Sequence, residues 1–403
     1  MVSLLVIGWG AAAETVPTLS NKIARTDWGA IRGVNFVPSY AANTYDIWHD
    51  YNHALFDRGL GLAEAVGYNS VRLWLNYAAF ADSGAAMVDH VEDAVRLCQK
   101  HRLKAVINLF DSCGIRPRPG AHRMTAPDAY ELFQSSARFT PAQKALMKQL
   151  FEHYVHGPGK YTTVAVGEDT PMMVLLFQDW QPTPGNDRLT ANYYPELEKY
   201  ANAIMDRLKD NPAVLLWDLM NEPEFASEGP IGPNVMNTPQ MVTLRDAFLT
   251  HFHDFVKRRF PNEVVSIGWA SLEEAAHHAN LADVLTFHVY AEGDSLEATI
   301  ARAVDLGRRT HKPIFITETL ANFDFGKPDF GSLASDEAQL AHYQKVLPIL
   351  LRSPVGWMAW GLVISRDFDP STDIFYPNGE PRPAALYLER ELKPKVPITE
   401  QRP

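Results

Sequence analysis

The amino-acid sequence predicts an α/β fold, a (β/α)8 TIM barrel with a long insertion between the third strand and its helix. Eight short apolar runs alternate with helix-like segments between positions 31 and 391, and such alternation is typical of a parallel sheet. Polar residues stand at the carboxyl ends of these runs, where the active sites of barrels lie. These strand-end residues are Asn35, Arg72, Asn76, Asp111, Asn221, Glu222, His288, Tyr290, Glu318 and Trp360.

The strands are recognised as short apolar runs bounded by turn residues. In chain order they are expected at 31–37, 70–76, 104–110, 214–221, 263–269, 284–290, 313–318 and 356–363. Pro38 ends the first strand and Pro223 stops the fourth, because proline cannot donate to a strand ladder. In the second strand Arg72 and Asn76 share one face, since alternate side chains point to opposite sides.

The helices are recognised by apolar residues that recur with the helical period. They are expected at 56–66, 87–101, 195–209, 238–259, 272–281, 296–310, 336–351 and 384–391. Gly67 suits the C-terminal cap of the first helix. Pro195 suits the first turn of the third helix.

Residues 112–187 break this alternation. Proline and glycine cluster at 115–120 and 182–185, around one helix expected at 141–155. A connection of this length is usually functional or forms a small subdomain. We therefore expect a single catalytic domain over 21–403 with this insertion, which would wall off one end of a cleft.

The N-terminal segment 1–20 is expected to be signal-like or flexible. Its apolar part ends in three alanines, Ala11, Ala12 and Ala13, which resembles the end of a secretory signal and favours export over a cytoplasmic location. The segment lacks a basic start. A loose glycine pattern at 8–13 also resembles a dinucleotide fingerprint, but Pro17 interrupts the helix that such a motif requires.

The charge and cysteine content exclude several classes of function. The formal net charge is −11, which argues against nucleic acid and anionic membrane surfaces as partners. No apolar run is long enough for a membrane span. Cys98 and Cys113 are the only cysteines, and they offer no metal-ligand spacing. They either pair or remain free. We therefore expect neither a metal nor a cofactor.

Two acids at strand ends carry the chemical prediction. Glu222 follows the apolar run 214–221, and Glu318 ends the run 313–318. A buried carboxyl is costly unless it is paired or used, and a buried salt bridge is the alternative for either acid alone. Hydrolysis of a glycosidic bond needs one acid to protonate the leaving oxygen and a second to attack or to stabilise the anomeric carbon.

These motifs resemble a known family. The stretch 31–391 is similar to clan A glycoside hydrolases, most like glycoside hydrolase family 5, the cellulase family. The motifs that carry the resemblance are Trp-Asp-Leu-Met-Asn-Glu-Pro at 217–223 and Ile-Phe-Ile-Thr-Glu at 314–318. The resemblance implies a retaining double displacement through a covalent glycosyl-enzyme intermediate. Glu222 would be the general acid/base, Glu318 the nucleophile, and Asn221 a ligand of the sugar 2-hydroxyl.

The resemblance also implies supporting roles. Arg72 would hold the nucleophile ionised, because a nearby cation lowers the pKa of a carboxylate. A barrel salt bridge, with Asp218 for example, is compatible with that role. Tyr290 would donate to the nucleophile, and His288 would lie beside the acid/base or the sugar.

Further strand-end residues are candidate substrate ligands. Trp360 resembles the tryptophan that forms the floor under the sugar, while Asn35 and Asn76 are polar groups at the first two strand ends. The family commonly carries a histidine near the end of the third strand, whereas this chain has Asp111. Asp111 is expected to contact a sugar hydroxyl instead, and this departure leaves the substrate open.

The sequence therefore predicts a retaining β-glycoside hydrolase acting on β-linked oligo- or polysaccharides. An exo-acting β-glycosidase or a transglycosylase on short oligosaccharides or glycoconjugates would use the same residues. A non-catalytic carbohydrate-binding barrel would need neither acid. A metal-dependent barrel hydrolase would need histidine clusters on early strands, and the histidine pairs at 251/253 and 277/278 fall on predicted helices.

Overall fold

The computed structural model describes most of the predicted catalytic domain. The described residues are 18–41, 44–112, 122–125, 163–166, 188–225, 239–321, 335–360 and 372–393, with the single positions 134, 135, 141, 144, 184 and 363. The N-terminal segment 1–17 and Cys113 lie outside them, as do most of the insertion 112–187 and the helix predicted at 141–155.

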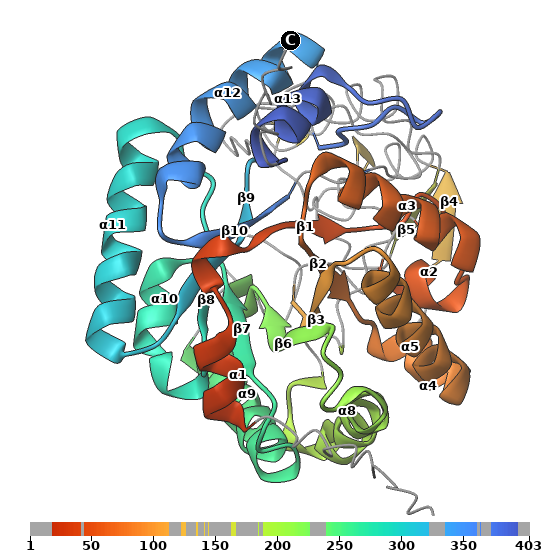
Figure 1. Cartoon of the computed structure of the whole chain (residues 1–403). Coiled ribbons are helices and arrows are strands. Elements are labelled where there is room, and N and C mark those ends of the chain that lie inside the picture. Colours follow the sequence, from red (N-terminus) through yellow and green to blue (C-terminus); the bar gives the residue numbers. More distant parts are fainter. Residues whose placement is uncertain are drawn as a thin grey trace, which may run out of the picture.

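Eight parallel strands form a closed barrel at the centre of the molecule, and helices surround it (Figure 1). The strands are β1 (Arg32–Phe36), β2 (Ser70–Trp74), β3 (Lys104–Asp111), β6 (Val214–Asn221), β7 (Val265–Trp269), β8 (Leu285–His288), β9 (Ile314–Thr319) and β10 (Gly356–Ala359). Their order around the barrel follows the chain, and β1 pairs with β10 to close it. The predicted (β/α)8 fold is confirmed.

All eight predicted strands are present, and several end earlier than predicted. The second ends at Trp74 and the eighth at Ala359. Within the insertion, β4 (His122–Thr125) and β5 (Thr163–Val166) pair antiparallel and stand apart from the barrel sheet.

The helices follow the strands as the alternation predicted. They are α3 (His53–Val66), α5 (Ala85–Lys100), α8 (Tyr194–Leu208), α9 (Pro239–Arg259), α10 (Leu272–His277), α11 (Gly293–Thr310), α12 (Asp336–Arg352) and α13 (Pro383–Leu392). Shorter helices are α1 (Leu19–Arg25), α2 (Thr44–His49) and α4 (Tyr77–Ser83). Gly67 caps α3 in the left-handed region at φ 103°, which glycine adopts without strain.

The core fills the barrel and the layer between strands and helices. Trp217, Trp269 and Trp357 are buried there, as expected for packing residues. Trp217 also donates from Nε1 to Glu263 Oε2 at 3.0 Å, so its one polar atom is satisfied. Cys98 is a buried free thiol in α5.

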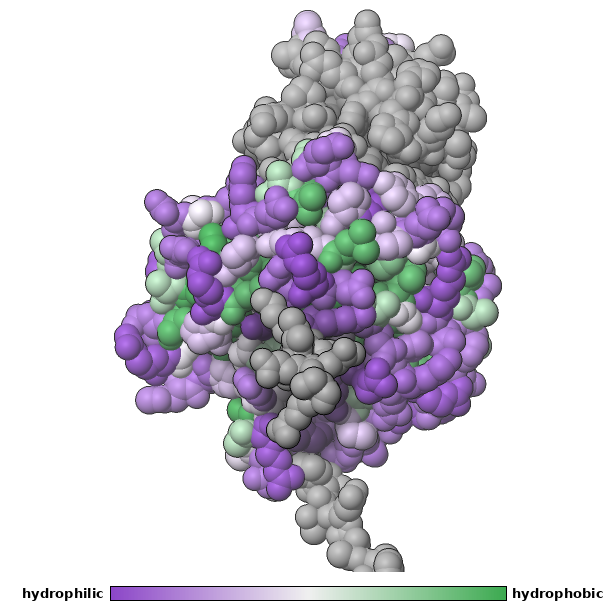
Figure 2. All heavy atoms as spheres, turned by 45° about the horizontal axis from the view of Figure 1, so that its top comes forward, coloured by the Kyte–Doolittle hydropathy of each residue, from purple (hydrophilic) through white to green (hydrophobic). Residues whose placement is uncertain are grey.

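The described surface is largely polar. In Figure 2 hydrophilic residues dominate the face that is turned forward, and hydrophobic residues are scattered between them. Among the described residues, the large hydrophobic side chains that are exposed are Val304 and Leu386. No helix in the described part of the chain has the length and apolarity needed to cross a membrane.

Candidate active site

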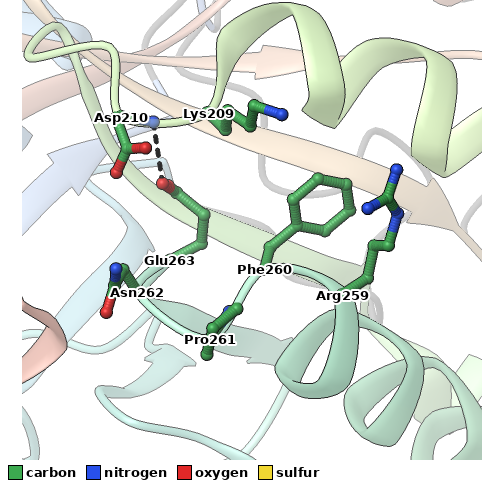
Figure 3. Close-up of a pocket in the computed structure, with 7 residues that line it drawn as sticks. All are labelled: Lys209, Asp210, Arg259, Phe260, Pro261, Asn262 and Glu263. Atoms are coloured by element: carbon green, nitrogen blue, oxygen red, sulfur yellow. Dashed lines mark hydrogen bonds between the residues drawn. The ribbon is translucent and has the colours of Figure 1, made fainter.

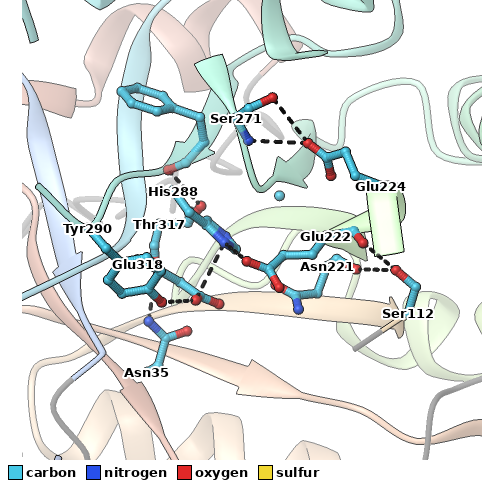
Figure 4. A network of polar contacts seen from close by, with 12 residues as sticks. Asn35, Ser112, Asn221, Glu222, Glu224, Ser271, His288, Tyr290, Thr317 and Glu318 are labelled. Carbon is cyan, nitrogen blue, oxygen red and sulfur yellow. Dashed lines mark hydrogen bonds and ion pairs between the residues drawn. The ribbon is translucent and has the colours of Figure 1, made fainter. Parts of the chain in front are cut away.

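Two carboxylates meet at the carboxyl end of the barrel. Glu222 directly follows β6, and Glu318 lies in β9, so two strands separate them around the barrel. One oxygen of each carboxylate and one ring nitrogen of His288 all lie within 4.8 Å of one another (Figure 4). The side chain of Glu318 is 4% exposed and that of Glu222 is 15% exposed. Both acids therefore share one small space, and Glu222 is the more open to solvent.

Arg72 donates hydrogen bonds to several side chains of the site. It lies in β2 and is fully buried. Its five N–H groups have five recorded hydrogen bonds: Nε and Nη2 donate to Asp218, Nη1 donates to Glu318 at 2.7 Å and to Asn35 at 3.2 Å, and Nη2 donates to Asn221 at 2.9 Å. A guanidinium has no further donor. Arg72 therefore positions the groups around the site and keeps no donor for a sugar, so a role as a substrate ligand, which its place at a strand end would allow, is ruled out.

Opposing influences act on the pKa of Glu318. Burial raises this pKa above its ordinary value of 4.5, and the nearby charge of Glu222 raises it further. His288, Arg72 and a hydrogen bond from the Tyr290 hydroxyl lower it. Burial is the largest of these effects and the net pKa is raised, so Arg72 limits the rise without reversing it.

His288 bridges the two acids as a neutral ring. Burial lowers its pKa to about 4. Nδ1 lies 2.7 Å from Glu222 Oε1 and 3.4 Å from Glu318 Oε2, whereas Nε2 is buried and has no partner among the described residues. A proton on Nε2 would be an orphaned buried donor, which is costly. We therefore assign the single proton to Nδ1, which donates to Glu222 Oε1.

The chain is similar in fold to several solved glycoside hydrolases. The chain matches a family 5 glycoside hydrolase of subfamily 18 from Streptomyces cattleya, solved with GlcNAc, at 14% identity and a TM-score of 0.53, over 90% of this chain and 81% of that one. The chain has the fold of a family 5 glycoside hydrolase. The fold thus agrees with the resemblance that the strand-end motifs indicated.

Two further structures extend the comparison. A subfamily 18 enzyme variant from Bifidobacterium longum, solved with Manβ1-4GlcNAc, matches at 13% identity and a TM-score of 0.54, over 90% of this chain and 77% of that one. An exo-β-1,4-mannosidase from an Opitutaceae bacterium matches at 14% identity and a TM-score of 0.52, over 90% and 58%. No family model and no curated protein matches the sequence. The likeness therefore lies in the fold.

Two of the predicted sugar ligands, Asn35 and Asn76, make hydrogen bonds that hold parts of the protein together. Asn35 is fully buried; Nδ2 donates to the backbone oxygens of Thr317 and Ala359, and Oδ1 accepts from Arg72. Both of its N–H groups are therefore spent. The prediction that Asn35 binds substrate is corrected, because it ties β1 to β9 and β10.

Asn76 is corrected for a similar reason. It is fully buried, and its Oδ1 accepts from the backbone N–H groups of Ala78 and Ala79, so it is the N-cap of α4. Its Nδ2 donates to Thr44 Oγ1 at 2.9 Å. The strand ends two residues before Asn76 because the side chain of Asn76 caps the start of a helix. The alternation of apolar and polar residues predicted a strand here and did not reveal this cap.

The remaining strand-end candidates lie at the site. Asp111 is 2% exposed, and its Oδ1 accepts from Asn221 Nδ2 at 3.0 Å. Trp360 directly follows β10 and is half-buried; its ring meets Trp74 edge to face with centroids 5.4 Å apart. Trp74 in turn covers Arg72, with the guanidinium carbon 4.6 Å from the ring centroid. The aromatic pair therefore adjoins the arginine that contacts Glu318.

One acid at the site was missed by the sequence reasoning. Glu224 lies in η5 (Pro223–Phe225), two positions beyond Glu222 (Figure 4). Its Oε1 accepts from the backbone N–H of Ser271 at 3.2 Å, while Oε2 is buried and has no partner among the described residues. Burial raises its pKa to about 7. The available signal was a second glutamate directly after the Asn-Glu-Pro tip.

Glu222, His288 and Glu318 are also the described residues whose donor atoms converge as a metal site would require. The guanidinium of Arg72 lies 2.7 Å from Glu318. This permanent positive charge opposes a cation at the same place. We therefore interpret the cluster as an acid pair with a bridging histidine.

A hollow lies at the opposite end of the barrel from the two carboxylates, where the chain leaves α8 and α9 (Figure 3). It measures about 160 Å³. Its buried acid, Glu263, accepts from Lys22 Nζ at 2.7 Å and from the backbone N–H of Asp210 at 2.9 Å. Together with its bond to Trp217, these contacts give Glu263 a structural role.

Proposed function

We propose that the chain is a retaining β-glycoside hydrolase. The observation that supports this most is the approach of a Glu222 oxygen and a Glu318 oxygen to within 4.8 Å. Retaining enzymes separate their two carboxyl groups by about 5–5.5 Å, whereas inverting enzymes leave about 6.5–9.5 Å for a water. The short separation favours direct attack by one carboxylate on the sugar.

Glu318 is the proposed nucleophile. Its carboxylate attacks the anomeric carbon, the bond from that carbon to the leaving oxygen breaks, and the electron pair stays on the oxygen. Arg72 and Tyr290 both donate to Glu318, which stabilises its ionised form in a buried setting. The product of this step is a glycosyl ester of Glu318.

Glu222 is the proposed general acid/base. In the first step it gives a proton to the leaving oxygen, and in the second it takes a proton from the water that cleaves the ester. Because His288 Nδ1–H donates to Oε1, that oxygen is held as an acceptor. The proton that Glu222 transfers is therefore carried by Oε2.

Short β-mannosidic substrates are proposed for the first assays. The support is that two of the matched structures are described as a complex with Manβ1-4GlcNAc and as an exo-β-1,4-mannosidase. These descriptions fit an exo-acting enzyme on short oligosaccharides better than an endo-acting one on polymers.

The test is a screen of aryl β-glycosides with the product anomer followed by NMR. We expect the β-anomer as first product. Glu318→Gln should reduce kcat by several orders of magnitude, and Glu222→Ala should be rescued by azide with formation of a β-glycosyl azide. Asp305→Asn, which removes a surface acid of α11, is the matched control. An α-anomer as first product, or near-normal turnover of Glu318→Gln, would reject the mechanism.

A further inference from the structure

The end of β3 holds the tip of β6 through two adjacent residues, Asp111 and Ser112. Asp111 contacts the side chain of Asn221, and Ser112 contacts the backbone oxygens of Asn221 and Glu222. We propose that Asp111 and Ser112 are positioning residues, which orient the Asn221 amide and the Glu222 carboxyl for the reaction. This inference rests on the proposed function.

Asp111 determines which way the Asn221 amide points. Asn221 Oδ1 accepts from Arg72 Nη2 at 2.9 Å, and Nδ2 donates to Asp111 Oδ1 at 3.0 Å. A flipped amide would set N–H groups against a guanidinium, which only donates, and an oxygen against a carboxylate, which only accepts. The flip is therefore strongly disfavoured, since both contacts are buried.

The bond to Asp111 affects how Asn221 can bind a substrate. The amide nitrogen of Asn221 carries two hydrogens, and one is used by Asp111. The described residues offer no recorded acceptor for the other hydrogen. It is the donor that Asn221 can present to a sugar hydroxyl, and its direction follows from the bond to Asp111. Asp111 itself is nearly fully buried, so it acts through Asn221 and not by touching the sugar.

Ser112 holds the backbone that carries Glu222. Glu222 has φ 43°, a left-handed conformation that is strained for a residue with a side chain and persists only where its surroundings enforce it. Ser112 donates from its backbone N–H to the Asn221 oxygen at 3.1 Å, and its hydroxyl lies against the oxygens of both Asn221 and Glu222 (Figure 4). On the other side, Glu222 N donates to the Gly268 oxygen at 2.7 Å.

These contacts set the direction of the Glu222 side chain. The strained peptide is held by β3 on one side and by β7 on the other, so Glu222 leaves the chain toward Glu318 instead of continuing the strand alternation. Loss of the Ser112 hydroxyl weakens the restraint on the β3 side, where only the backbone N–H of Ser112 still donates to the Asn221 oxygen. The general acid is then less often placed against the leaving oxygen.

The first test measures recognition of the 2-hydroxyl. The ratio of kcat/KM for an aryl β-glycoside to that for its 2-deoxy analogue is compared between the wild type, Asp111→Leu and Asp111→Asn. Leucine has a similar shape without an acceptor, and we expect the ratio to fall about tenfold or more. Asparagine keeps an acceptor oxygen and should restore most of the ratio. An unchanged ratio in Asp111→Leu overturns the role of Asp111.

The second test uses Ser112→Ala. This substitution is small, so it can test the proposal even if Asp111→Leu does not fold. We expect kcat to fall about tenfold on substrates with poor leaving groups and little on activated ones such as dinitrophenyl glycosides, with KM nearly unchanged. A purely structural role would lower the melting temperature and leave the leaving-group dependence as in the wild type. That result overturns the role of Ser112.

The proposed hydrolase activity and the positioning roles of Asp111 and Ser112 can be tested separately. Absence of hydrolysis by the wild-type chain would overturn the proposed function and this inference together. Normal hydrolysis that depends on Glu222 and Glu318, combined with wild-type behaviour of the Asp111 and Ser112 variants, would overturn this inference alone.

Discussion

At the scale of single residues, the site depends on how each polar atom is satisfied. Arg72 distributes five donors over four side chains, and one of the recipients is Glu318. Burial nevertheless leaves the pKa of Glu318 above its ordinary value. The ionisation of this carboxyl therefore depends on all the groups that donate hydrogen bonds to it. The Tyr290 hydroxyl is one of these donors, and a substitution by phenylalanine removes it.

Tyr290→Phe is expected to shift the acidic limb of the kcat/KM profile to higher pH. The hydroxyl donates to Glu318 Oε2, and its removal disfavours the ionised form, so the pKa of Glu318 rises further. We expect a loss of roughly tenfold in kcat/KM at low pH, measured as a pH–rate profile. Tyr68→Phe removes a buried hydroxyl that has no partner among the described residues and should leave the limb in place. Coinciding profiles for Tyr290→Phe and the wild type would contradict this account.

Glu224→Gln is expected to change how stability depends on pH. The folded-state pKa of Glu224 is raised to about 7 from 4.5, so its protonated form stabilises the fold fully below pH 4.5, and this contribution is lost as pH rises through 7. Glutamine does not titrate. Relative to the wild type, the variant should therefore gain up to about 3 kcal/mol between pH 4.5 and 8, measured by urea unfolding.

Glu273→Gln is the control for that measurement. A hydrogen bond from Arg302 lowers the pKa of Glu273, so the effect of its removal should be small and of opposite sign. A stability difference for Glu224→Gln that stays flat across this range would show that Glu224 is ionised throughout.

At the scale of elements, the backbone of β7 lies directly against the buried ion pair of Arg72 and Asp218. A methyl group on Gly268 of β7 would lie 2.6 Å from Arg72 Nη2 and 2.8 Å from Asp218 Oδ2. The Gly268 N–H also donates to Asp218 Oδ1 at 2.7 Å. Because Gly268 has no side chain, the buried ion pair of Arg72 and Asp218 can lie against β7. In this position Arg72 donates to Glu318.

Gly268→Ala is expected to displace Arg72 and with it Glu318. A displacement of about 1 Å at catalytic groups can cost on the order of 10²-fold in rate, and overpacking costs about 1–3 kcal/mol of stability. Steady-state kinetics and thermal unfolding measure the two effects. Near-normal kcat/KM in a folded variant would show that the ion pair tolerates movement.

At the scale of the whole molecule, the barrel depends on its closure between the first and last strands. β1 pairs with β10, and the first residue of β10, Gly356, lies against η1 (Trp28–Ala30). A methyl group at Gly356 would lie 2.1 Å from the Trp28 oxygen and 2.8 Å from Ile31 Cβ. This contact is at the amino end of the strand, away from the carboxylates.

Gly356→Ala should therefore separate stability from catalysis. We expect a loss of several kcal/mol in the free energy of unfolding, because backbone must move to admit the methyl group. The activity per folded molecule should stay near that of the wild type, in contrast to Gly268→Ala. Denaturant unfolding and active-site titration measure the two quantities. A selective loss of activity in the Gly356 variant would show that closure is transmitted to the site.

Sequence patterns predicted the fold and the positions of the acids because both are local properties. Eight apolar runs alternate with helices, and Glu222 and Glu318 each stand at the end of such a run, which a barrel brings to one face. The polar residues at other strand ends carried the same signal. That signal did not separate Asn221 from Asn35 and Asn76, because all three are amides at strand ends.

Tertiary structure alone decided which of these groups remain available to a substrate. Asn35 is used by β9 and β10, and Asn76 by the start of α4. The sequence determined the barrel and its two acids. Their separation and their hydrogen-bond partners follow from strand register and barrel closure, which join segments as far as 324 residues apart and leave no trace in any local pattern.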